Sequence, residues 1–212
     1  MLFARGVSLA PNLGTSVMAL IILLIIVAGI IFYLVSIYNG LVGGRNGYKN
    51  AFAQIDVQLQ RRYDLIPNLV ETAKAYMAHE KGTLEAVTAA RSAGMAGLAA
   101  AKANPGDPQA MQQLGQAETQ LQNAMLNFKA VAEAYPDLKA NQNMMQLTEE
   151  LTSTENRVAA ARQFYNDAVM SYNNMREVFP NSLISTRYGF TPATPLEVDT
   201  PEAKKAVKVS FS

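Results

Sequence analysis

The sequence predicts an all-α membrane protein in which one N-terminal transmembrane helix leads into an antiparallel bundle of three to four long helices. Three observations support this prediction: an uncharged apolar run near the N-terminus, apolar residues spaced alternately three and four apart in the remainder, and clusters of Pro and Gly between those stretches. The 212 residues allow one ordinary domain beside the membrane segment. We therefore expect a short N-terminal segment (1–14), a transmembrane helix (15–38), a bundle domain (39–190) and an irregular C-terminal tail (191–212).

The apolar run extends from Val17 to Val35 and contains a single Gly29. A bilayer core of about 30 Å requires about 20 such residues in a helix. A cleaved signal peptide is the main alternative, but its apolar region usually spans about 7 to 15 residues and ends at small residues. We expect this run to be retained in the cell membrane, with the lipid bilayer as its partner.

The orientation of the span follows from the basic residues at its two ends. Arg5 precedes the run, whereas Arg45 and Lys49 follow it. This small excess predicts a cytoplasmic bundle, since basic residues concentrate on the cytoplasmic side.

The first stretch of the bundle begins with Gly40, Gly43 and Gly44, which predict a hinge because glycine weakens a helix. Beyond them, one helical stripe extends to about residue 101, and Pro67 predicts a kink or break near Ile66. Residues 45–101 would span about 85 Å, twice the length of the next stretch, so the membrane-proximal half lacks a facing helix unless the chain folds back. We expect self-association, as a homo-oligomer, to cover part of that half, whose apolar residues are Phe52, Ile55, Leu59 and Ile66.

Two further stretches carry a clearer pattern. Asp107 and Pro108 have the form of a helix N-cap followed by proline at the first helical position. Glu118 is the only polar residue on the apolar stripe that follows. The last stretch carries an unbroken stripe from Met144 to Phe179. Mutual burial of these stripes predicts ordinary core packing rather than a cofactor site.

The run from Arg61 to Glu71, RRYDLIPNLVE, is highly specific, and further motifs follow at residues 135–141, 155–162, 164–169, 179–180 and 189–190. In these segments and in their order the chain resembles the LemA family of bacterial membrane proteins. The resemblance implies one membrane helix and a bundle of about four helices. It implies no reaction; association of a relative with membrane shaping in magnetosome formation favours a scaffold role by analogy alone.

The residues offer little for catalysis. The chain has no Cys, and its single His79 begins an H-E-x-x without the second His that zinc proteases require. A di-iron bundle site needs two His, and no serine-nucleophile or phosphate-loop motif is present in the sequence. We therefore expect no enzyme activity, no metal and no cofactor, although a membrane-tethered hydrolase of another type remains an alternative.

Charge excludes one class of partner and suggests another. Of 18 basic residues, 17 follow the apolar run, where all 17 acidic residues also lie, so the bundle lacks the basic surplus of a nucleic-acid binder. Polar residues beside the stripes should pair if they are buried. The alternative is a patch of Arg61, Arg62, Tyr63 and Asp64 that contacts lipid headgroups or an unidentified protein partner. The sequence thus favours a self-associating scaffold or adaptor in membrane organisation, and the alternative is a module that binds an apolar ligand or lipid in the bundle core.

Overall fold

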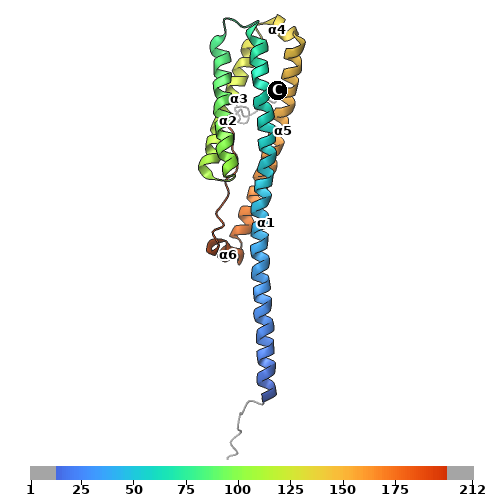
Figure 1. Ribbon diagram of the computed structural model, residues 1–212, viewed down its shortest axis with the longest axis vertical. Helices are drawn as coiled ribbons and strands as arrows, with labels where there is room; N and C mark the ends of the chain where they lie inside the picture. The colour runs from blue at the N-terminus through green and yellow to red at the C-terminus, as the bar shows by residue number, and fades with distance from the viewer. Residues whose placement is uncertain (1–12, 200–212) are drawn as a thin grey trace, which may run out of the picture.

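The computed structural model describes residues 13–199 as an all-α protein, which confirms the predicted fold class. Four long helices run alternately up and down, and they form a bundle from whose lower end α1 projects as a single stalk (Figure 1). Residues 1–12 and 200–212, which include most of the predicted N-terminal segment and tail, lie outside the described residues. The helices are α1 (Leu13–Lys74), α2 (Lys81–Ala103), α3 (Pro108–Ala132), α4 (Pro136–Ala140), α5 (Gln142–Glu177) and α6 (Asn181–Arg187).

The stalk is the apolar half of α1. From Gly14 to Ser36 every residue is exposed, and the first buried side chain is that of Ile37. These 23 residues correspond to about 35 Å of helix, close to the thickness of a bilayer core. By length and composition, α1 is the one helix among the described residues that is able to cross a membrane, and its apolar window is not buried inside the protein.

The predicted glycine hinge is wrong, because α1 continues through Gly40 and Gly44 without interruption. The two glycines instead admit α5 closely. A Cβ at Gly44 would lie 3.3 Å from the Tyr172 ring, and one at Gly40 would lie 3.8 Å from Sδ of Met175. Packing of α5 along this face supports the helix where the glycines alone would weaken it.

The expected break near Ile66 is also displaced. α1 continues through Pro67 to Lys74, and the chain turns at residues 75–80 before α2 begins. The predicted single stretch 45–101 is therefore two antiparallel helices, and they supply the fourth long helix of the bundle.

The apolar stripe of the membrane-proximal half is covered within the chain. Phe52, Ile55, Leu59 and Ile66 are each at most 2 % exposed. α5 packs along α1 over most of its bundle half, and Phe52 contacts the ring of Tyr165 edge-on at 5.6 Å between centroids. The premise that no helix of the chain reaches this stripe was wrong, so these four residues provide no surface for self-association.

Side-chain caps mark the first residues of α3 and α5. Asp107 Oδ1 accepts a hydrogen bond of 2.9 Å from the backbone N–H of Ala110, which confirms the predicted N-cap of α3. Asn141 caps α5 in the same way, through the N–H of Met144 at 3.1 Å. After α6 and Gly189, whose φ is +69°, residues 190–199 follow the bundle without regular secondary structure.

Candidate functional site

A buried ion pair joins α1 to α3. The guanidinium of Arg62 contacts Glu118 Oε2, and the Tyr63 hydroxyl donates a hydrogen bond to Glu118 Oε1. Arg62 is 9 % exposed and Glu118 is 3 % exposed. Burial and the adjacent carboxylate raise the pKa of Tyr63 well above its ordinary range, so the phenol stays protonated and remains a donor. The polar residue that interrupts the α3 stripe therefore has a partner, as buried polar groups require.

The same tyrosine explains why Pro67 does not end α1. Proline has no N–H, so the carbonyl of Tyr63, four residues earlier, loses its helical donor. Nε of Arg91, on α2, donates to that carbonyl at 2.6 Å. α2 thus replaces the missing hydrogen bond from outside the helix. α2 also lies very close to the side chain of Tyr63, since a Cβ at Gly94 would lie 2.8 Å from the Tyr63 hydroxyl oxygen.

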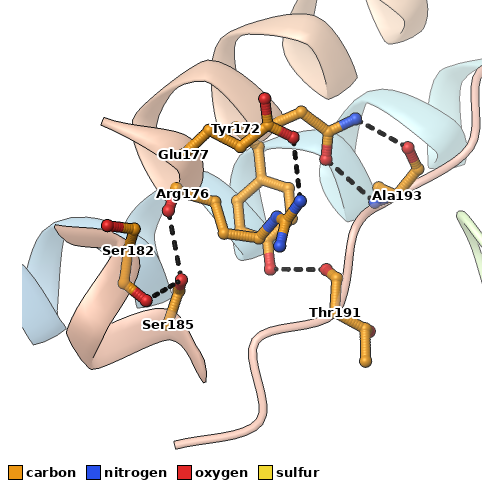
Figure 2. Close-up of polar contacts among 8 residues, drawn as sticks. Tyr172, Arg176, Glu177, Ser182, Ser185, Thr191 and Ala193 are labelled. Carbon is orange, nitrogen blue, oxygen red and sulfur yellow. Dashed lines mark hydrogen bonds and ion pairs between the residues drawn. The ribbon is translucent and has the colours of Figure 1, made fainter. Parts of the chain in front are cut away.

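An extended segment, residues 190–199, lies between α3 and α5, and we call it the strap. Tyr172 donates to the carbonyl of Thr191 at 2.9 Å, as Figure 2 shows. Asn173 forms two hydrogen bonds with Ala193: its amide donates to the carbonyl at 2.8 Å, and its Oδ1 accepts from the N–H at 3.0 Å (Figure 2). Two neighbouring side chains of α5 thus hold the backbone of the strap.

The same arrangement occurs seven residues earlier along α5. Tyr165 donates to the carbonyl of Thr194 at 2.9 Å. Asn166 forms the same pair of bonds with Leu196, at 3.2 Å to the carbonyl and 2.8 Å from the N–H. Each repeat thus consists of a Tyr-Asn pair on α5 and a Thr-Pro-x triplet in the strap.

The two repeats match because their lengths agree. Seven residues of α-helix separate successive Tyr-Asn pairs by about 10.5 Å. Three residues of extended chain, of which proline fixes one, advance by about 9 to 10 Å. A heptad on the helix therefore presents its amides in register with every third residue of the strap.

The opposite wall of the strap is α3 and the turn before it. The N–H of Thr194 donates to the carbonyl of Gly106 at 2.9 Å, and the N–H of Asp199 donates to Oγ1 of Thr119 at 3.2 Å. A Cβ at Gly115 would collide with the carbonyl oxygen of Glu197, so glycine is required there. Leu196, which is 2 % exposed, fills the space between the helices.

The space between α3 and α5 continues beyond the strap, away from the stalk, and there it is open. This open part has a volume of about 720 Å³ and an apolar lining that includes Leu69, Phe128, Leu138, Met144 and Leu151. Charged residues of both signs stand along its lining: Lys129, Glu133, Lys139 and Glu149. A smaller cavity of about 270 Å³, beside Arg62 and Glu118, separates this groove from the strap.

Comparison with known families adds to the geometry. The sequence model of the LemA family matches residues 51–211. The chain belongs to the LemA family. Compared with curated proteins, it shows no match. The matched range covers α1 from residue 51 onward, the other helices and the strap, so the groove lies within the family domain.

For this LemA-family chain, the predicted contact patch at residues 61–64 is corrected in part. Arg61 and Asp64 are exposed, but Arg62 and Tyr63 belong to the buried ion-pair network and cannot contact lipid or a partner. Arg61 also lies 26 residues beyond Val35, about 39 Å along the helix, which is far from any headgroup at the end of the stalk.

Among the described residues, no cluster of three or more His, Cys, Asp or Glu side chains is positioned to hold a metal ion. The network around Glu118 has a donor for each carboxylate oxygen, and although Arg62 and Glu118 line the cavity of about 270 Å³, both residues are almost fully buried. It fixes the register of α1 against α3. The arrangement that sequence reasoning missed is the strap, although the repeated Tyr-Asn and Thr-Pro pairs were a visible signal.

Proposed function

We propose that this LemA-family chain is a membrane-anchored adaptor that binds an extended segment of a second protein in the open, membrane-distal half of the α3–α5 groove. One observation carries the proposal: the membrane-proximal half of the same groove already holds an extended segment, the strap, through main-chain hydrogen bonds. The distal half continues that interface. Such a role requires no catalysis.

The anchor is the exposed, apolar half of α1. A helix with 23 exposed residues and no charge would be unstable in water, whereas a bilayer accommodates it. The basic residues Arg45 and Lys49 favour a cytoplasmic bundle. Protease added to spheroplasts should leave the bundle intact, and digestion of the bundle would reverse the orientation.

The open groove has the properties of a surface for polypeptide side chains. Met125, Met144 and Met145 line it, and flexible methionines adapt to different partners. Along α5 the lining of the open groove runs from Met144 to Asn156, which is about 18 Å of helix. That length accommodates about five extended residues.

Site-specific photocrosslinking in native membranes tests this proposal. A photoreactive residue at Met145, which is 52 % exposed in the groove, should crosslink to a second polypeptide; the same residue at Met95 on α2, which is 45 % exposed, should not. Thr152→Arg, which fills the groove from an exposed position, should abolish the crosslink. Gln146→Arg, also exposed on α5 but outside the groove lining, should preserve it.

Two outcomes contradict the adaptor proposal. Equal crosslinking at the two positions indicates that the groove has no special affinity. Crosslinks from Met145 that lead only to residues 200–212 of the same chain indicate that the groove holds its own C-terminus.

A second candidate function is the binding of an apolar ligand, which the Leu, Met and Phe lining of the same groove favours. Organic extraction of the purified protein should then yield a stoichiometric lipid or other apolar molecule that the Thr152→Arg variant lacks. Self-association is a separate proposal that now needs another surface, and sizing the protein in native membranes tests it.

A further inference from the structure

The lower end of the bundle carries a cluster of exposed apolar side chains. Val178 and Phe179 follow α5, and Leu183 and Tyr188 lie on and just after α6. Their exposed fractions are 54, 80, 63 and 62 %. Elsewhere on the bundle, large exposed apolar residues are more scattered, which is ordinary for a protein surface.

This cluster lies beside the part of α1 where the apolar run ends, at Val35. Residues 40–44 of α1 stand opposite residues 172–175 of the antiparallel α5, as the contacts of Gly40 and Gly44 show. The end of α5 at Glu177 therefore lies level with residues 38–39, and Phe179 follows two residues later, close to the end of the apolar run at Val35. The ring of Tyr188 packs edge-on against Tyr38 at 5.3 Å, which places α6 at the same level. Figure 1 shows α6 beside α1 at the junction of bundle and stalk.

α6 buries the polar Ser185 and exposes the apolar Leu183, while Ile184 packs against the core. Ser185 is 1 % exposed, and its hydroxyl bonds to the carbonyls of Arg176 and Ser182, each at 3.1 Å (Figure 2). The amide of Asn181 donates to the carbonyl of Met175 at 2.9 Å. These bonds fix the orientation of α6, so Leu183 cannot turn inward. A short helix that hides serine and presents leucine is unsuited to water and suited to lipid.

The surrounding charges fit an anionic bilayer surface. Arg187 on α6 and Lys49 on α1 are exposed, and the guanidinium of Arg45 lies 5.1 Å from the centroid of the Phe190 ring. The acidic Glu177 is engaged by Arg176 at 2.9 Å. Basic residues and aromatic rings both favour the headgroup zone.

We propose that Val178, Phe179, Leu183 and Tyr188 insert into the interface of the bilayer that α1 crosses, so that α6 is a second membrane contact of the bundle. The proposal rests on the membrane anchor proposed above. Its occupant is the boundary between headgroups and acyl chains, because the cluster adjoins the apolar span directly.

Tryptophan fluorescence tests this inference, since the chain has no Trp. The full-length Phe179→Trp variant is reconstituted in vesicles of phosphatidylcholine with a minority of phosphatidylglycerol, with or without brominated acyl chains. The matched control is Phe164→Trp, because Phe164 is a 61 % exposed aromatic residue of α5, 15 residues or about 22 Å further from the membrane. We expect blue-shifted emission and several-fold stronger quenching by brominated lipid for Phe179→Trp than for the control.

The possible failures are distinguishable. A third variant, Leu24→Trp, reports on the span itself. Strong quenching for Leu24→Trp with none for Phe179→Trp would overturn the second contact while leaving the anchor, and no quenching for either would overturn both. Blue-shifted emission at position 179 without lipid quenching would also refute the inference, because another protein surface would then cover the cluster.

Discussion

Replacement of Glu118 tests the buried ion pair that joins α1 to α3. In Glu118→Leu, the guanidinium of Arg62 loses its counter-charge inside the bundle and the Tyr63 hydroxyl loses its acceptor. The side chains of Arg62 and Glu118 are only 11 % and 4 % exposed, so only water in the adjacent cavity of about 270 Å³ can solvate the charge left behind.

The expected magnitude follows from that burial. Removing one member of a buried ion pair costs about 3 to 5 kcal/mol, most of it for the charge left without a partner. The orphaned Tyr63 hydroxyl alone would cost about 1 to 3 kcal/mol, and the two effects overlap because both groups share Glu118. We expect a loss of about 4 kcal/mol for Glu118→Leu, and a smaller loss for Glu118→Gln, which keeps an acceptor for Tyr63.

The double variant Arg62→Met with Glu118→Leu is the decisive comparison. It removes both charges and keeps apolar volume, so we expect it to be more stable than Glu118→Leu alone by about 2 kcal/mol or more. Thermal unfolding of the full-length protein in detergent, followed by circular dichroism at the helical band, measures these differences. Additive losses in the double variant would refute the reasoning, because they would show that the two side chains contribute independently.

Three further predictions concern the remaining contacts. Arg91→Met keeps the aliphatic stem but leaves the Tyr63 carbonyl without a donor, so we expect the free energy of unfolding to fall by about 1 to 2 kcal/mol in the same assay. In a Pro67→Ala background residue 67 regains its N–H, so the same substitution should cost less. An unchanged cost would contradict our account of the proline. Asn173→Leu removes both bonds to the strap and should lower stability by about 1 to 3 kcal/mol and speed proteolysis within residues 190–199, whereas the exposed neighbour variant Asn174→Leu should do neither. The raised pKa of Tyr63 means that the folded state holds the phenolic proton more tightly than the unfolded chain, whose pKa is near the ordinary 10.0; its contribution is therefore complete below about pH 10 and lost as pH rises further. Tyr63→Phe should weaken the dependence of unfolding on pH above that value, and an identical dependence in the two proteins would exclude Tyr63 as a cause.

Local rules predicted those parts of the fold that local chemistry determines. The cap at Asp107 and the long last helix followed from residues within a few positions of each other. The break that was one of the two outcomes predicted at Pro67 does not occur, because the compensating donor, Arg91, comes from another helix 28 residues away. No pattern within α1 contains that information.

In the candidate site, too, the sequence predicted local features but not the contacts between helices. The sequence indicated that polar residues beside the stripes should pair if they are buried, but not which residues pair. Arg62 therefore remained, as the alternative, in a patch that contacts lipid or a partner. The stripe of α1 was predicted to be covered partly by self-association because residues 45–101 were read as one long helical stretch and α5 was not matched to α1. Pairing between helices depends on where each helix ends, and an error of a few residues there changes which faces meet.

The uninterrupted α1 makes the position of the groove depend on the tilt of one helix. Single transmembrane helices tilt by about 20° on average. The bundle half of α1, from Ile37 to Lys74, is about 57 Å long, so such a tilt would displace the distal groove sideways by about 20 Å. A joint at Gly40 and Gly44 would add to this freedom, but α5 packs against both glycines. A second contact through α6, set to one side of α1, opposes tilting because any tilt pushes the exposed apolar cluster deeper into lipid or lifts it into water. The contact through α6, together with the transmembrane span, would then determine where the groove lies relative to the bilayer.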